Sequence, residues 1–196
     1  MVLTSGSRPQ QLKRGHKPGT KGVYCAQRAV PARDSGLARS RYGAAMPAEL
    51  EIAPLQEAEY ERLLPLIAAY QRFYEVVEVD EARNRAFFRR FLAPSEAGML
   101  LGAWEGGELL GYACLYWHFS STKAVETVLM NDLFVDPDRR RKGIGRALIE
   151  ASAEVARERG ADQLQWSTAP DNVTAQRLYD RTGAERSTWL EYELRL

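Results

Sequence analysis

The stretch NDLFVDPDRRRKGIGRALIEASAEVAR, residues 131–157, predicts a strand, a basic turn and a helix that begins directly after the turn. Its apolar start ends at Val135, where Asp136-Pro137-Asp138 supplies residues that restrict φ and form local hydrogen bonds, as turns require. After the turn, small and apolar residues recur at helical spacing, namely Ile144, Ala147, Leu148, Ala151 and Val155. We therefore expect the turn to lie at the N-terminus of a helix.

The turn itself, residues 139–145, has the sequence RRRKGIG and combines four cationic side chains with two glycines. The first amides of a helix have no partner within the helix, and the helix dipole places positive charge at the same end. Glycine allows a ligand to approach the backbone closely. Together these features predict a site for a phosphate or a pyrophosphate. The alternative without a ligand is a solvated basic turn in front of an ordinary helix.

Two common phosphate-binding motifs do not match this turn. A Walker A loop needs four residues between its glycines, followed by Lys and then Ser or Thr. The dinucleotide fingerprint needs Gly or Ala where this chain has Leu148. The pattern Arg140-x-x-Gly143-x-Gly145, after a strand that ends at Val135, instead resembles the acetyl-CoA signature of the GCN5-related N-acetyltransferases, the GNAT family.

A second segment, residues 169–179, resembles another part of the cofactor site of the same family. It contains Asn172-x-x-Ala175-x-x-Leu178-Tyr179 and is followed by Gly183. Asn172 at a helix start can hydrogen-bond a pantetheine amide, and Tyr179 is two turns further on. By spacing alone Tyr179 could be a core residue, but a phenol with a pKa of about 10 can also donate a proton to a departing thiolate. The resemblance covers residues from about 52 to 194 and is strongest from 131 to 183.

The resemblance implies an α/β (α+β) GNAT fold. This is a mixed, mostly antiparallel sheet of six to seven strands, flanked by about four helices and splayed beside the strand that ends at Val135. In this family the pantetheine arm enters the splay and pairs with the free strand edge like an added strand. Acetyl-CoA would be a cosubstrate, and no metal is needed. The implied cofactor-binding residues are Leu133, Phe134, Val135, Arg140, Arg141, Lys142, Gly143, Ile144, Gly145, Arg146, Asn172, Ala175 and Tyr179.

The rest of the chain from Leu50 has the pattern of a compact α/β domain. The Gly106-Gly107 pair predicts a hairpin between two apolar runs. Pro65 would kink or split the first helix, and Asp171 or Asn172 would cap the last one. Besides the helix after the basic turn and the short last helix, helices are expected at 56–74 and 80–92, and strands at 50–52, 99–104, 109–119, 125–135, 163–168 and 187–196.

The strand before the basic turn also suggests a branch of the family. Leu133-Phe134-Val135-Asp136-Pro137, together with Thr182-Gly183-Ala184 and Trp189-x-x-Tyr192, resembles the diamine, histone/polyamine and D-amino-acid acetyltransferases. Those enzymes commonly carry Glu-Asp before this strand, and the Glu acts through water as the base.

This chain departs from that pattern, because it has Asn131-Asp132 instead. An amide cannot accept the proton. Asp132 is the nearest remaining carboxylate, and Glu126 is a weaker candidate. By alternation Asn131 and Asp132 should face opposite sides of the strand unless a bulge intervenes. The candidate catalytic residues are therefore Tyr179, Asp132 and the substituted position Asn131.

The first 45 residues differ in composition from the rest. The chain has 27 basic and 26 acidic residues. Nine basic residues and one acidic residue lie in the first 45 positions, so residues 46–196 contain 18 basic and 25 acidic residues. Rich in Gly, Ser and Pro, residues 1–45 are predicted to be a disordered basic leader or a non-native extension, and residues 46–196 the N-acetyltransferase domain.

No apolar run approaches the roughly 20 residues of a membrane span. The two cysteines, Cys25 and Cys114, suggest no disulfide framework, so we expect a cytoplasmic protein.

The function implied by the resemblance is acetyl-CoA-dependent transfer of an acetyl group to a primary amine by direct attack. The acceptor would be a polyamine, an amino acid or a lysine-like amine, and the excess of acidic residues in 46–196 favours a cationic one. The alternative is a coenzyme-A-binding regulatory module without turnover, which Asn131 in place of Glu favours. We expect no nucleic-acid or membrane partner, and residues 189–196 are apolar enough to form a homodimer. The densest acidic cluster is Glu75, Glu78, Asp80 and Glu81.

Overall fold

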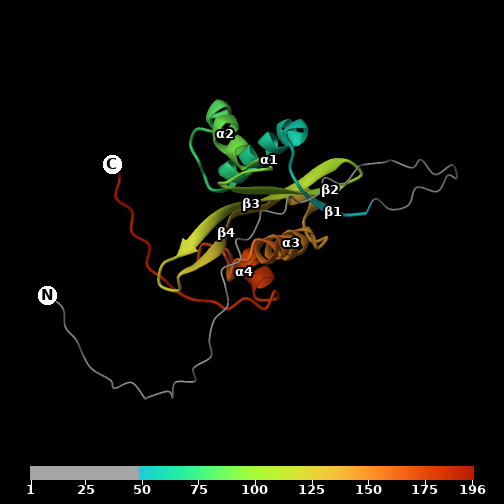
Figure 1. The fold of residues 1–196 in the computed structure, drawn as a ribbon. Coiled ribbons are helices and arrows are strands. Elements are labelled where there is room, and N and C mark those ends of the chain that lie inside the picture. The colour runs from blue at the N-terminus through green and yellow to red at the C-terminus, as the bar shows by residue number, and fades with distance from the viewer. Residues whose placement is uncertain (1–48) are drawn as a thin grey trace, which may run out of the picture. The chain divides into compact units, whose positions relative to one another are not determined.

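The computed structural model describes residues 49–196, so the predicted leader of residues 1–45 lies outside the described residues. Within this range the chain forms five strands and four α-helices (Figure 1). Short 3-10 turns cover Glu57–Glu59, Arg89–Phe91 and Pro137–Arg139. The main elements in chain order are β1 (Glu51–Pro54), α1 (Tyr60–Phe73), α2 (Glu81–Phe88), β2 (Gly98–Glu105), β3 (Glu108–Ser120), β4 (Val125–Val135), α3 (Ile144–Glu158), β5 (Gln163–Gln165) and α4 (Val173–Tyr179).

The five described strands form one sheet in the order β1-β2-β3-β4-β5. The first three pairs are antiparallel, and β5 runs parallel to β4, so the prediction of a mixed, mostly antiparallel sheet is confirmed. The β2–β3 hairpin turns at Gly106 and Gly107, where φ is 59° and 82°. Glycine adopts such positive φ values without the steric cost that a side chain would add, which is why this pair makes the turn.

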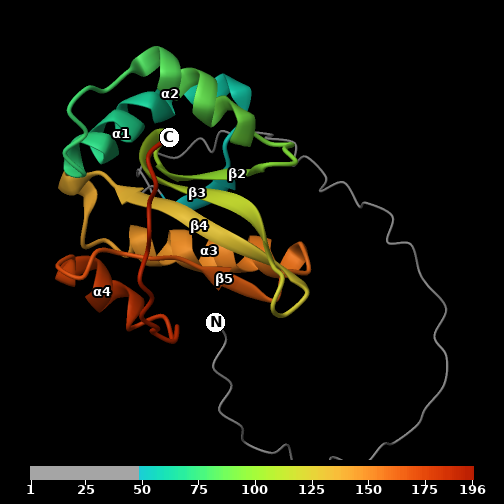
Figure 2. The same ribbon diagram turned by 90° about the vertical axis from the view of Figure 1, so that its left-hand side faces the viewer.

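The helices cover the two faces of the sheet in pairs. Figure 1 and Figure 2 show α1 and α2 on one face, and α3 and α4 on the other. Because side chains alternate along a strand, neighbouring residues of β2 enter different cores. Leu100 packs with buried residues of α1 such as Ile67, whereas Leu101 packs with buried residues of α3 such as Leu148. The domain thus has two apolar cores, one on either side of the sheet.

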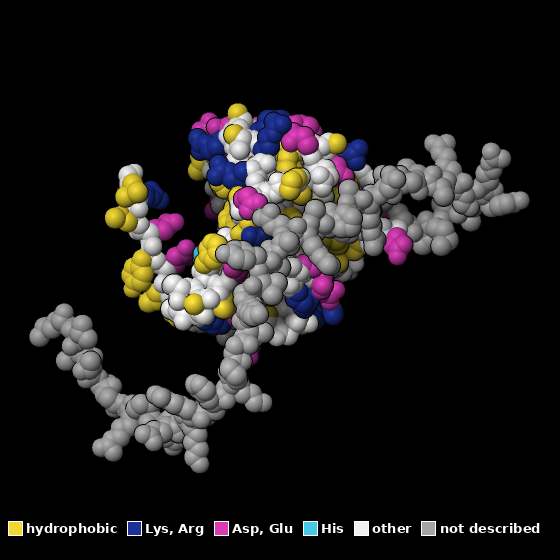
Figure 3. All heavy atoms as spheres, in the orientation of Figure 1, with side chains coloured by type: hydrophobic (Ala, Val, Ile, Leu, Met, Phe, Trp, Pro, Cys, Tyr) yellow, Lys and Arg dark blue, Asp and Glu magenta, His cyan; other side chains and the backbone are white. Residues whose placement is uncertain are grey.

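Within residues 49–196 the strand count is five rather than the predicted six to seven. The predicted strand at 187–196 does not form, since residues 184–196 adopt neither helix nor strand. Figure 1 shows this tail leaving the fold, and Figure 3 shows hydrophobic side chains uncovered along it. Its residues do alternate, but a strand also needs an edge to pair with, and β5, at three residues, is shorter than the predicted 163–168. Trp189, Leu190 and Tyr192 consequently expose 80% or more of their surface.

The helix predictions are right in place and need correction in detail. Pro65 does not split α1, because the proline lies on the exposed side while Leu63 and Ile67 anchor the helix to the core on either side of it. The predicted helix at 80–92 forms α2, which ends at Phe88, and continues as the 3-10 turn through Phe91. None of the described helices is long and apolar enough to cross a membrane.

Candidate active site

A β-bulge at Asn131 determines which way the following residues of β4 face. Met130 and Asp132 pair with two consecutive residues of β3, so Asn131 is an extra residue on β4. A bulge of this kind reverses the alternation of side chains beyond it. Met130 therefore packs in the core beside α3, while Phe134 packs in the core beside α1. Asp132, two residues before Phe134, is placed on the α1 face.

The Asp132 carboxylate is buried, and only 6% of the residue is exposed. Asn131 Nδ2 donates to Asp132 Oδ1 over 3.1 Å, and the Tyr70 hydroxyl is a second side-chain hydrogen-bond partner. Burial raises the pKa of Asp132 to about 6, and the hydrogen bonds from Tyr70 and Asn131 act in the opposite direction. At neutral pH the group is mainly ionised, and its pKa is close enough to neutrality for it to accept and release a proton.

Aromatic rings surround this carboxylate. Tyr70, near the end of α1, lies edge-on to Tyr74, Tyr112 and Phe134, with ring centroids 5.0, 6.3 and 5.8 Å away. The Tyr112 hydroxyl is buried and has no hydrogen-bond partner within residues 49–196. Neither tyrosine is identified as a site residue by the sequence alone. Tyr70 follows Ile67 at helical spacing, so periodicity could have placed it on the inner side of α1, but no local pattern shows that it reaches β4.

The edge of β4 that faces away from β3 is open along the end of the strand. β5 pairs with β4 only along Thr127–Leu129. The amide of Asp136, directly after β4, donates to a carbonyl of β3 over 2.9 Å. Because bonding alternates along an antiparallel ladder, Phe134 also bonds toward β3, while the backbone groups of Leu133 and Val135 point to the open edge. Of the three amides predicted to hold pantetheine, those of Leu133 and Val135 are available, and that of Phe134 is not.

The basic turn is open around Gly143, the residue before α3. Gly143 has a φ of 81°, and a side chain at this position would meet no atom within 4 Å. Arg141 also has a positive φ, of 66°. The amides of Ile144 and Gly145 at the start of α3 have no acceptor within the helix. This amide-lined and unobstructed turn fits a pyrophosphate group.

Three cations of the turn and of the start of α3 form surface ion pairs with nearby carboxylates. Arg139 donates to both carboxylate oxygens of Glu108 over 2.7 and 2.9 Å, and Lys142 lies 3.8 Å from Glu105. Arg146 pairs with a glutamate one turn further along α3 over 2.7 Å. Exposed pairs of this kind contribute little stability, so a phosphate can replace the carboxylate partner at small cost.

Arg140 is folded back from the turn toward the open strand edge. Its Nε donates to the Val135 carbonyl over 3.0 Å. Its guanidinium lies 5.8 Å from the Phe134 ring and 5.9 Å from the Phe73 ring. Contacts of a guanidinium with aromatic rings are attractive because the ring face is electron-rich. Arg140 thus connects the basic turn with the aromatic residues of the α1 side.

Gly145 also has a packing role. A Cβ on Gly145 would lie 3.1 Å from Leu178 Cδ2, so the absence of a side chain allows α3 to contact α4. Asn172 caps α4, since its Oδ1 accepts a hydrogen bond from the Ala175 amide over 3.2 Å. That oxygen is engaged in the cap, which leaves Asn172 Nδ2 to meet a pantetheine carbonyl.

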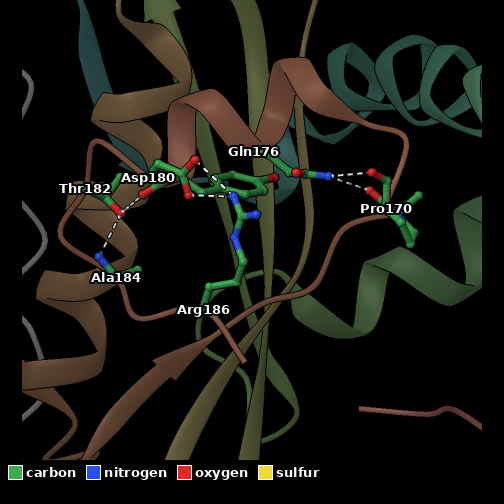
Figure 4. Close-up of polar contacts among 8 residues, drawn as sticks. Pro170, Gln176, Asp180, Thr182, Ala184 and Arg186 are labelled. Carbon is green, nitrogen blue, oxygen red and sulfur yellow. Dashed lines mark hydrogen bonds and ion pairs between the residues drawn. The ribbon is translucent and has the colours of Figure 1, made fainter. Parts of the chain in front are cut away.

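Side-chain hydrogen bonds hold α4 at both ends and so position Tyr179 (Figure 4). Gln176 Nε2 donates to the Pro170 carbonyl over 2.8 Å, and the Thr182 hydroxyl donates to the Tyr179 carbonyl over 2.7 Å. The Tyr179 ring is partly buried and lies edge-on to Trp166, with centroids 5.5 Å apart. Burial, and secondarily Tyr74, raises the pKa of Tyr179 above its usual value, so its hydroxyl stays protonated at neutral pH and can act as a donor.

The other candidate groups lie apart from this arrangement. Glu126 is exposed and 3.8 Å from Arg159, which makes it a poorer base than Asp132. Asp80 caps α2 by accepting the Arg83 amide over 2.9 Å, so one member of the acidic cluster has a structural role. Two surface hollows of about 330 and 320 Å³ lie elsewhere, at the β3–β4 turn and along α3. In the described part of the chain no three His, Cys, Asp or Glu side chains are grouped to hold a metal ion.

Comparison with known proteins decides the family. The sequence matches the Acetyltransferase (GNAT) family over residues 63–184, which is more than half of the chain. The chain belongs to the GNAT family. It is 37% identical over 114 residues to a D-amino-acid N-acetyltransferase of Saccharomyces cerevisiae, covering 57% of this chain and 70% of that protein. It is 30% identical over 137 residues to a thialysine N-epsilon-acetyltransferase of Bos taurus, covering 66% of this chain and 79% of that protein.

The fold of this GNAT protein is also found among solved structures. A crystal structure of a probable acetyltransferase superposes with a TM-score of 0.67 at 26% identity, over 74% of this chain and 97% of the other. The family and the fold predicted from the two sequence motifs are therefore confirmed, and the protein is an acetyltransferase. GNAT enzymes use acetyl-CoA, which supplies the acetyl group as a thioester.

Proposed function

We propose that this GNAT enzyme transfers the acetyl group of acetyl-CoA to the primary amine of a small cationic acceptor by direct attack. The acceptor class is a polyamine, an amino acid or a lysine-like amine. Two similar proteins are named for amines of this class, a D-amino acid and thialysine, and this supports the proposal. The acidic excess of residues 46–196 supports a cationic acceptor, because a negative surface concentrates cations.

The observation that carries the proposal is the buried carboxylate of Asp132 beside the open edge of β4. A protonated amine with a pKa of about 10 must lose a proton before it can attack a thioester. Asp132, with a pKa of about 6, is ionised at neutral pH and takes this proton directly or through a water molecule. Asn131 occupies the position of the family's Glu, and it donates a hydrogen bond to Asp132 instead of accepting the proton.

The cofactor is held mainly by backbone groups in this proposal. The amides of Leu133 and Val135 bind the pantetheine arm at the open edge and polarise the thioester carbonyl, an interaction commonly worth about 3 kcal/mol of barrier. The pyrophosphate lies in the turn around Gly143, whose surrounding cations are Arg140, Arg141, Lys142 and Arg146. Asn172 and Ala175 line the arm from α4, and Tyr179 donates a proton to the departing thiolate.

The connection between α1 and α2 forms the acceptor side in this proposal. Here apolar and acidic side chains are exposed together, which suits an amine that has an aliphatic stem and a positive charge. The exposed residues are Phe73, Tyr74, Glu75, Val76, Val77 and Glu78.

The test is release of coenzyme A with a panel of amines that contains spermidine, lysine, D-amino acids and a histone-tail peptide. Asp132→Asn should lower turnover roughly 10²-fold at pH 7 and recover part of it as pH rises, because the free amine becomes abundant. Glu126→Gln, which removes an exposed carboxylate from the same strand, is the matched control and should stay at wild-type turnover.

The outcomes separate the two candidate functions. Binding of acetyl-CoA without turnover on any amine would favour the regulatory module instead of the transferase. Equal turnover of Asp132→Asn and wild type from pH 6 to pH 10 would remove Asp132 as the proton acceptor and leave the transferase proposal in place.

The exposed tail supports a homodimer as a further part of the proposed function. Residues 189–196 carry apolar side chains at alternate positions and leave them uncovered in the single chain. Pairing of two tails, or of a tail with the sheet of a second copy, would bury them. Light scattering at micromolar concentration should give a dimer mass, and deletion of residues 187–196 should give a monomer. A monomer mass for the full chain would contradict the proposal.

We further propose that residues 1–45 are dispensable for activity and that the enzyme is cytoplasmic. The composition of residues 1–45 supports the first statement. The buried free thiol of Cys114 suits a reducing compartment and supports the second. Deletion of residues 1–45 should leave the melting temperature and turnover nearly unchanged, and cell fractionation locates the enzyme.

A further inference from the structure

The last turn of α1 places one aromatic side chain directly across from the bulge of β4. The Tyr70 ring is held edge-on by Tyr74 directly after the helix, by Tyr112 of β3 and by Phe134 of β4. Three such contacts on one ring leave little rotamer freedom, so the direction of its hydroxyl is fixed by packing. Tyr112 and Phe134 are cross-strand partners, and the next pair on the same face of the sheet is Cys114 and Asp132, so the Tyr70 ring packs beside the Asp132 carboxylate.

Asp132 has no ion-pair partner within residues 49–196. From β3 it faces Tyr112, Cys114 and Tyr116, whose own pKa values are raised, first by burial and also by the Asp132 charge. These groups stay neutral. From its own strand the neighbour is the Asn131 amide, and from α1 it is the Tyr70 hydroxyl, which lies next to Tyr74. The nearby cation of the turn, Arg140, is directed to the Phe134 ring and the Val135 carbonyl.

We propose that Tyr70 is a positioning residue of this enzyme, whose hydroxyl donates to the Asp132 carboxylate and holds it oriented and ionised beside the open edge of β4. This inference rests on the proposed role of Asp132 as the proton acceptor. A buried carboxylate without a cationic partner tends to become protonated, and donors to its charged form oppose this. Tyr70 and Asn131 are the two side chains that supply such donors.

The two donors are not equivalent. Asn131 is exposed, so water competes with its amide for the carboxylate. Tyr70 is partly buried and its ring is packed among other rings, so its hydroxyl is held more firmly than the Asn131 amide. The pKa of Tyr70 is itself raised strongly, first by burial and then by the Asp132 charge, so its hydroxyl stays protonated and remains a donor over the whole working range of pH.

The test uses Tyr70→Phe in the full chain, which keeps the ring and removes only the hydroxyl. With ¹³C-labelled Asp carboxyl groups, NMR titration should show the pKa of Asp132 rising by about one unit relative to wild type. The acidic limb of the kcat/KM profile should move to higher pH by the same amount, with roughly tenfold lower activity below pH 6 and near-wild-type activity at pH 9.

Tyr116→Phe is the matched control, because it removes a phenol hydroxyl from the same face of β3, from a ring that stacks on Phe91 with centroids 4.9 Å apart. It should leave both the NMR pKa and the pH profile unchanged. A purely structural role of Tyr70 would lower the melting temperature without moving either quantity.

The two measurements separate this inference from the proposed function. An unchanged NMR pKa of Asp132 in Tyr70→Phe overturns the inference, whatever the activity. A raised NMR pKa with an unmoved kcat/KM profile supports the Tyr70 contact and removes Asp132 as the proton acceptor.

Discussion

The two faces of the sheet contribute to the proposed reaction in different ways. The proposed cofactor site consists mainly of backbone amides and exposed cations from one continuous segment, residues 133–146. On the α1 face, the proposed proton acceptor is the buried side chain of Asp132, and the partly buried Tyr70 beside it comes from a separate element. A site made of backbone tolerates changes in the side chains around it. A site made of buried side chains depends on each contact, because every lost partner leaves a desolvated group behind.

The largest expected effect is on the backbone side, from Gly143→Asp. The new carboxylate would enter the open turn and repel the pyrophosphate, so the affinity for acetyl-CoA should fall roughly 10³-fold or more, beyond detection by calorimetry. Gly160→Asp is the matched control, because Gly160 has a similar φ of 78° and equally open surroundings at the other end of α3. Both variants should be strained equally, and only the first should lose acetyl-CoA. Equal affinities would show that the turn does not hold the pyrophosphate.

On the side-chain face, Asp132→Asn should raise stability at neutral pH while it lowers turnover. The folded pKa of Asp132, about 6, lies above the ordinary 3.8, so wild-type stability is full below the lower value and declines as pH rises through the higher one. The decline amounts to roughly 3 kcal/mol and is absent in the variant. Urea unfolding at pH 4 and pH 8 should give a variant-minus-wild-type difference larger at pH 8 by this amount. A difference that does not change with pH would mean that the carboxylate is not desolvated.

Tyr179→Phe tests the proton donor that α4 is proposed to supply. Loss of the hydroxyl should lower kcat roughly 10²-fold and leave the affinity for acetyl-CoA nearly unchanged, because a proton donor acts in the transition state. Tyr192→Phe, in the exposed tail, should have no effect on either quantity. If kcat stays at the wild-type value, the thiolate takes its proton from water and α4 only shapes the cofactor site.

The smallest effect is expected from Tyr112→Phe. The Tyr112 hydroxyl is buried without a partner, and such a group costs free energy in the folded state. Its removal should therefore raise the free energy of unfolding by about 1 kcal/mol, measured by urea denaturation. A loss of stability would show that an ordered water bonds this hydroxyl, and the side-chain face would then be wetter than the packing indicates.

The sequence by itself determined the segment that is proposed to hold the cofactor. The strand, the basic turn and the helix of residues 131–157 follow each other in the chain, and each depends on local rules for turns, caps and helical spacing. The Gly106-Gly107 hairpin and the Asn172 cap are local in the same sense, and each forms where the sequence places it. The motifs around Gly143 and Tyr179 were therefore enough to predict the family and the mixed sheet.

Only the tertiary structure decided the acceptor side and the ends of the sheet. The bulge at Asn131 exists because of how β4 pairs with β3, and it alone turns Asp132 toward α1. Tyr70, the proposed donor to Asp132, comes close to it through packing between elements that are distant in the chain. The tail after Gly183 has the alternation of a strand but lacks an edge to pair with. Alternation and spacing describe a chain's own residues, whereas register, burial and edge pairing depend on partners that no local pattern contains.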